Sequence, residues 1–104
     1  MKPSVAVVVV SVLLGTAPVA HADENAYYSE LAQKIDTPLT NTHAMYLAMI
    51  ACNAIRAGVS AGLPTDQARA KADSAVEWAQ NDLGIGLSQS DDTTLVNAAE
   101  DQIC

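Results

Sequence analysis

The chain has 104 residues, half of them hydrophobic, and its 12 acidic residues against 5 basic ones give a formal net charge of −7. A surface this acidic repels phosphate backbones and anionic lipid headgroups, which makes nucleic acid and peripheral membrane binding poor expectations. No apolar stretch reaches the roughly 20 residues that a membrane-spanning helix needs, so we expect no stable membrane anchor.

The first 22 residues have the layout of a secretory signal peptide. Lys2 precedes an apolar run from Val5 to Leu14, and Ala20-His21-Ala22 places small residues at both ends of an A-x-A cleavage site. We therefore predict a signal peptide over 1–22 and cleavage between Ala22 and Asp23. The mature protein is then secreted or extracytoplasmic, in the cell envelope or the extracellular medium.

Residues 23–104 are expected to form a single all-α domain, a small bundle of three or four helices. With Lys2 removed, 4 basic residues stand against 12 acidic ones, a net charge of −8. The segment is rich in alanine and shows no alternating β-branched runs, so its periodicity is helical throughout.

The first helix is predicted over 23–35, with Tyr28, Leu31, Ala32 and Ile35 on one apolar face. Thr37-Pro38 ends it, because proline disfavours a helical residue before it.

The second helix is predicted from Asn41 or Thr42 to Ala57, capped by Thr40 or Asn41 and terminated by Gly58 in the left-handed conformation. Since 44–52 contains no charged or amide side chain, we expect a central, buried helix.

The third helix is expected to begin after a cap at Thr65, with Trp78 packed into the core beside an apolar stripe. This stripe contains Ala68, Ala72, Ala75, Val76, Ala79 and Leu83. The fourth helix follows Ser88-Gln89-Ser90-Asp91, a capping-box spacing in which Ser88 or Ser90 is the cap. Its inward residues are predicted to be Leu95, Val96, Ala99 and Ile103.

Two cysteines, Cys52 and Cys104, occur in this short exported chain. An even cysteine count in such a chain favours a disulfide, which here would join the second helix to the end of the fourth. Two free or intermolecular thiols are the alternative.

Motifs that carry catalysis are absent from the sequence, and we predict no enzyme, no cofactor and no metal site. His43 is the only histidine after residue 22, and both cysteines are expected to be bonded. Gly84-Ile85-Gly86 lacks the lysine and third glycine of a phosphate loop, and Asp91-Asp92 lacks the spaced oxygen ligands of a calcium loop. We interpret the first as a linker and the second as helix N-terminal acids.

Residues 23–104 resemble a family of small exported actinobacterial proteins, abundant in mycobacteria and known only as a domain of unknown function. The resemblance lies in Tyr28-Ser29-Glu30-Leu31, in Ile50–Ser60 around the first cysteine, and in Leu95–Cys104 before the last. It implies a compact all-α domain with one disulfide and a location outside the cytoplasm after export. It carries no catalytic residue to this chain, which departs from the pattern at Asp36-Thr37-Pro38 and at Ile103.

We therefore expect an exported, non-enzymatic helical protein that acts by contact with an unidentified protein partner, its acidic surface favouring a basic one. The alternative is a carrier of a small apolar ligand, lipid or haem, in a pocket between helices. Tyr27, Tyr28, Met45, Met49 and Trp78 would line that pocket, and His43 would be the candidate haem ligand. An apolar cavity would favour the carrier, and a solid core with an exposed apolar patch the contact protein. The oligomeric state is left open.

Overall fold

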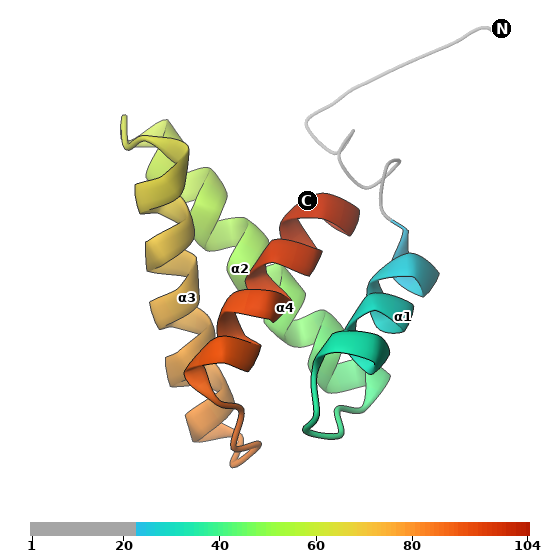
Figure 1. The fold of residues 1–104 in the computed structure, drawn as a ribbon. Helices are drawn as coiled ribbons and strands as arrows, with labels where there is room; N and C mark the ends of the chain where they lie inside the picture. The colour runs from blue at the N-terminus through green and yellow to red at the C-terminus, as the bar shows by residue number, and fades with distance from the viewer. Residues whose placement is uncertain (1–22) are drawn as a thin grey trace, which may run out of the picture.

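The computed structural model describes residues 23–104, which form four α-helices and no strand (Figure 1). These are α1 (Glu24–Lys34), α2 (Asn41–Ser60), α3 (Thr65–Asp82) and α4 (Gln89–Gln102). The predicted all-α domain is confirmed, whereas the predicted signal peptide lies outside the described residues. Within 23–104, no helix has both the length and the apolar character needed to cross a bilayer.

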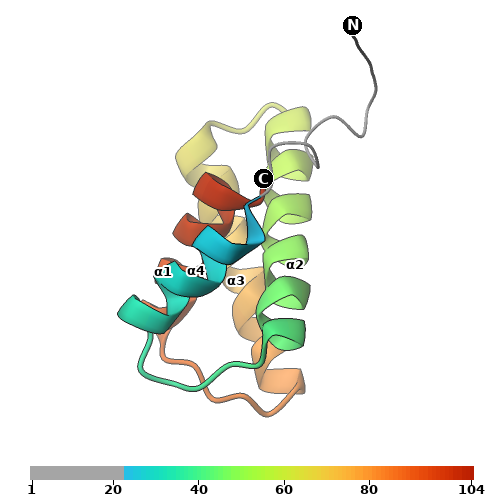
Figure 2. The same cartoon turned by 90° about the vertical axis from the view of Figure 1, so that its right-hand side faces the viewer.

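The helix α2 is in contact with all three other helices of the domain. The next helix, α3, runs back along it in the opposite direction, and α4 lies across the near side of both (Figure 1). The first helix packs mainly on α4 and touches α2 only lightly. Figure 2, turned by 90°, shows that α1 and α4 lie on the same side of α2, so the opposite side of α2 is not covered by either.

Side-chain caps fix the beginnings of three helices. The side chains of Asp23, Thr40 and Ser88 accept backbone N–H bonds at 3.0, 3.1 and 3.0 Å. The predicted cap at Thr65 is wrong. Pro64 occupies the cap position of α3 in an extended conformation and Thr65 is already helical, so α3 begins with no side-chain cap.

The predicted end of α2 at Ala57 is also wrong, because the helix continues through Gly58 to Ser60. Gly58 is a buried helical residue against which α3 packs: a Cβ built on it would lie 2.8 Å from Cβ of Ala68. The left-handed residue is Gly62, with φ +94°. Gly58 therefore serves the close approach of α2 and α3, and Gly62 turns the chain.

The core lies where the four helices meet, and the predicted inward face of α1 is right at Leu31 and Ile35 but includes Tyr28 and Ala32 where the structure has Tyr27. Tyr27, Leu31 and Ile35, spaced by four residues, are buried. Tyr28 is half-buried and Ala32 is exposed. The Tyr27 hydroxyl donates to the carbonyl oxygen of Ala44 at 2.7 Å, which ties α1 to α2. Burial, with a smaller contribution from Tyr28, raises the pKa of Tyr27, so the phenol keeps its proton.

Candidate functional site

The largest exposed apolar side chains lie on α2 and α3. Tyr46 and Met49 of α2 are 51% and 48% exposed, and Trp78 of α3 is 73% exposed. The prediction that α2 is buried is therefore only half right. The residues of α2 that face the other helices are buried, whereas Tyr46 and Met49 are exposed. The predicted core position of Trp78 is wrong, because Trp78 lies beyond the edge of the buried stripe of α3.

Helical geometry places Tyr46 and Trp78 on the side of the molecule away from α4. Arg69 of α3 pairs with Glu100 of α4, and Trp78, nine residues or about two and a half turns later, points the opposite way. Cys52 of α2 faces the end of α4, to which it is bonded, and Tyr46 is about a third of a turn away from that direction. We call Tyr46, Met49 and Trp78 the outer face.

The three residues also lie at similar heights along the helix pair. Gly58 of α2 meets Ala68 of α3. Because the two helices run in opposite directions, Trp78 lies at the level of Ala48, ten residues back along α2. That level falls between Tyr46 and Met49, so the three side chains lie at one height of the helix pair. Met49, nine residues before Gly58, is on the side of α2 turned away from α3.

Two open hollows adjoin the outer face where α1 meets the beginning of α2. One, of about 340 Å³, lies between α1, the 35–40 connection and α2, with Leu31, Ile35 and Leu39 among its lining residues. The other, of about 420 Å³, has Met45, Tyr46 and Met49 in its wall. Tyr28 and Asn41 line both hollows, so together they form one groove of mixed polar and apolar lining that leads from α1 to Tyr46 and Met49.

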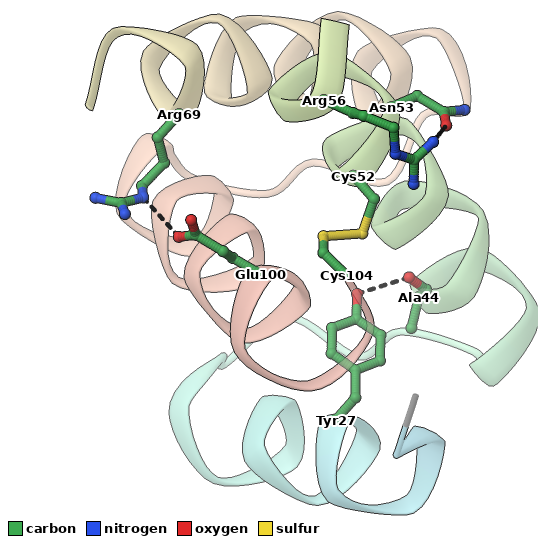
Figure 3. Close-up of a disulfide and its surroundings, with 8 residues drawn as sticks. All are labelled: Tyr27, Ala44, Cys52, Asn53, Arg56, Arg69, Glu100 and Cys104. Atoms are coloured by element: carbon green, nitrogen blue, oxygen red, sulfur yellow. Dashed lines mark hydrogen bonds and ion pairs between the residues drawn. A yellow bond between two sulfur atoms is a disulfide. The ribbon is translucent and has the colours of Figure 1, made fainter. Parts of the chain in front are cut away.

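Charge is distributed unevenly around this surface. The 20 residues of α2 include no acid and a single base, Arg56, which donates to Asn53 Oδ1 at 3.1 Å (Figure 3). The acids of the described residues lie on α1, α3, α4 and the connection before α2, where Asp36 lines the first hollow. Apart from Asp36, the groove and outer face are thus an uncharged strip with acidic surroundings.

The predicted disulfide between Cys52 and Cys104 is confirmed, and its Cα atoms are 5.4 Å apart (Figure 3). Beside it, Tyr27 points toward Ala44. A disulfide indicates an oxidising compartment, which agrees with the predicted export. The predicted cleavage site is described only on its Asp23 side, where Asp23 caps α1 and its N–H donates to the Gln102 carbonyl at 2.7 Å.

Of the residues predicted to line a ligand pocket, the structure brings together Tyr28, Met45 and Met49. Tyr27 is fully buried in the core, and Trp78 is exposed on α3. His43 is half-buried and lines neither hollow. Across 23–104, no group of three histidine, cysteine or acidic side chains comes together as a metal site would require.

Two buried polar side chains on α3 and α4 were missed by sequence reasoning. Gln80 is 2% exposed and Asp92 is 1% exposed. Asp92 is predicted only as a helix N-terminal acid, and no prediction covers Gln80. Their spacing of four residues from the apolar residues Val96 and Val76 is the signal that could have placed them inward.

Comparison of the chain with models of protein families, with curated proteins and with solved structures finds no match. The resemblance to exported actinobacterial proteins accordingly stays a prediction.

Proposed function

We propose that this protein is an exported, non-enzymatic contact protein whose outer face and adjoining groove bind an apolar segment of a protein partner. The observation that carries the proposal is the outer face itself, where Tyr46, Met49 and Trp78 are about half to three-quarters exposed, whereas the other large apolar side chains of the domain, except Val59 and Leu83, are buried or half-buried. Large exposed apolar side chains that gather in one part of a protein surface are typical of interaction sites.

Tyrosine, tryptophan and methionine are the side chains that protein interfaces favour, because they bury a large area with few rotatable bonds or adapt to irregular partners. The outer face contains one of each. Its tryptophan is the only one in the chain. The surface composition thus fits a binding centre better than a solvated helix flank.

The acidic surroundings support a partner with basic residues flanking its apolar segment. Two of the four bases in 23–104 are already paired with acids, Lys34 with Glu30 and Arg69 with Glu100. The remaining excess of negative charge attracts a cationic partner at long range, while the uncharged strip makes the contact. The predicted signal peptide and the disulfide support the cell envelope or extracellular medium as the compartment in which this protein binds its partner.

An amphipathic peptide built only of leucine and lysine is a direct probe of this proposal, with a leucine–glutamate peptide of the same pattern as its control. We expect the leucine–lysine peptide to shift Trp78 fluorescence to shorter wavelength and to protect Trp78 from acrylamide. Two-dimensional NMR should show shifts centred on Tyr46 and Met49.

Binding should weaken at least tenfold in a Tyr46→Ser/Met49→Ser variant, since both apolar contacts are removed. Val59→Ser is the matched control, because Val59 is 49% exposed on the same helix but lies about 15 Å further along it. Equal loss in both variants, or NMR shifts centred on α4, would contradict the proposal.

A carrier of a small apolar ligand is the second candidate, favoured by the hollow of about 340 Å³ that Leu31, Ile35 and Leu39 line. This volume is within the range of small-molecule pockets. Leu31, Ile35 and Leu39 give this hollow an apolar part that a small apolar ligand could contact, and nothing in it favours haem, since His43 is not among its lining residues. Native mass spectrometry of the protein from its exporting host tests this candidate: extra mass lost on denaturation would establish a ligand and its size.

A further inference from the structure

Three buried carboxylate oxygens lie between α3 and α4 without a hydrogen-bond partner. They are both oxygens of Asp92, on α4, and Oδ1 of Asp73, on α3. The other oxygen of Asp73 accepts from Thr93 Oγ1 at 3.2 Å, which places the two aspartates at the same point of the contact between these helices. Asp92 is only 1% exposed, so its carboxylate has almost no contact with bulk water.

The charged groups that act on this pair are nearly all acids. Asp73 and Glu77 from α3 and Asp91 from α4 act on Asp92. Arg69 is the base that acts on Asp73, and it donates to Glu100 Oε1 at 2.7 Å. On the two other helices, Lys34 of α1 pairs with Glu30, and Arg56 of α2 donates to Asn53. Lys71 of α3 is exposed, and neither oxygen of Asp92 has a hydrogen-bond partner, so no base in the described residues is bonded to Asp92.

An ionised carboxylate in this position is costly, because it is buried, unbonded and next to other acids. A proton removes the charge and supplies one O–H donor to a group of oxygens that otherwise only accept. Burial first, then Glu77, Asp73 and Asp91, raise the pKa of Asp92 to about 6. Burial also raises the pKa of Asp73, although its bond to Thr93 and the nearby Arg69 oppose this.

We propose that Asp92, together with Asp73, is a proton-controlled latch between α3 and α4. When the pair holds a proton, the first turns of α4 pack closely on α3. When both carboxylates are ionised, their repulsion and unsatisfied burial loosen this contact. Asp73 lies on the side of α3 that faces α4, whereas Trp78 points away from α4. The proposed latch therefore does not depend on the proposed outer face.

The direction of the pH dependence follows from the proton balance. The folded protein holds the Asp92 proton up to about pH 6, whereas an unfolded aspartate, with a pKa of 3.8, has already lost it. This group therefore stabilises the fold most at low pH, and its contribution is lost as pH rises through about 6. Between about pH 5 and pH 7.5, these two pKa values lower the ratio of folded to unfolded protein roughly tenfold.

Urea unfolding at about pH 5 and pH 7.5 tests the latch in the full domain, with Asp92→Asn as the decisive variant. Asparagine has the same shape as the protonated carboxyl and does not titrate. We expect Asp92→Asn to abolish the roughly tenfold pH effect and to be more stable than the wild type at pH 7.5. Asp91→Asn, a change of the neighbouring and more exposed acid, should keep the pH effect.

Hydrogen exchange, corrected for the intrinsic effect of pH, locates the loosening. In the wild type, amides 92–96 of α4 should exchange about tenfold faster relative to the Ala48–Cys52 amides at pH 7.5 than at pH 5, and Asp92→Asn should remove this difference. Asp73→Asn should reduce the pH effect without abolishing it. The proposal is wrong if Asp92→Asn keeps the wild-type pH effect, or if millimolar Ca²⁺ or Mg²⁺ stabilises the wild type at pH 7.5 and not Asp92→Asn, since a cation would then occupy the proton's place.

Discussion

The two sides of α3 hold their neighbours by different chemistry. Toward α2, α3 presents alanines, and Ala68 meets the glycine of α2 so closely that an added Cβ would lie 2.8 Å away. Toward α4, it presents the polar side chains of Arg69 and Asp73, and Gln80 bonds the connection that leads into α4. The contact with α2 depends on volume, whereas the contact with α4 adds hydrogen bonds and charge to a shared apolar core that includes Val76 and Val96. Solution conditions such as pH should therefore act on the second and leave the first unchanged.

The two buried polar side chains near this contact, Gln80 of α3 and Asp92 of α4, differ in their hydrogen bonding. Gln80 Oε1 accepts from the N–H groups of Gly86 and Leu87 at 3.0 and 2.9 Å, and Nε2 donates to the Leu87 carbonyl oxygen at 3.2 Å. Its amide thus satisfies the backbone of the 83–88 connection. Asp92 has no partner for either oxygen. One buried polar group fixes the turn into α4, and the other makes the seating of α4 sensitive to protons.

The largest effect is expected at the disulfide, which joins α2 to the residue at the end of α4, the two helices that pack on opposite sides of α3. Cys52 and Cys104 are separated by 52 residues, and a bridge that closes a loop of this size stabilises a domain by roughly 4 kcal/mol. A Cys52→Ser/Cys104→Ser variant should lose about that much stability in urea unfolding. Reductant should destabilise the wild type by a similar amount and leave the variant unchanged. A variant as stable as the oxidised wild type would show that helix packing alone holds α4 in place.

Loss of the Gln80 amide should come next, at about 3 kcal/mol, because Gln80→Leu leaves buried N–H and C=O groups of the connection without partners. Urea unfolding measures the loss, and it should be nearly equal at pH 5 and pH 7.5, since no titrating group is removed. Gln67→Leu, an exposed change on the same helix, is the matched control and should alter stability by less than about 0.5 kcal/mol. Equal losses in the two variants would mean that the connection holds itself without Gln80.

Sequence reasoning predicted the four helices and the disulfide, because helical periodicity and cysteine count depend on the chain alone. It also predicted the inward residues Leu95, Val96, Ala99 and Ile103, which are buried. These residues belong to a helix whose apolar face is bounded by clearly polar positions, so only one side of that helix could be predicted to face the core.

The failures occur where a neighbouring helix, and not the residue itself, decides the environment. Trp78 is apolar and exposed because no described helix covers its flank of α3, and Asp92 is acidic and buried because α3 does cover its side of α4. Gly58 has the type of residue that ends helices, but α3 needs its missing side chain. Periodicity shows which residues share a face; only the tertiary arrangement shows which faces are covered.

The smallest effect, and the sharpest test of the volume-dependent side, is expected from Gly58→Ala. The new methyl group meets Cβ of Ala68 at 2.8 Å and its Cα at 3.1 Å, so α3 must move outward. Overpacking of this kind costs roughly 1–3 kcal/mol, and the better helix propensity of alanine returns about 1 kcal/mol. We expect a net loss of about 1 kcal/mol in urea unfolding, the same at pH 5 and pH 7.5. Adding Ala68→Gly should relieve the contact, so the double variant should lose less than the two single variants together. Strict additivity would mean that α2 and α3 are not in close contact at Gly58, and a loss that changes with pH would mean that the two sides of α3 are not independent.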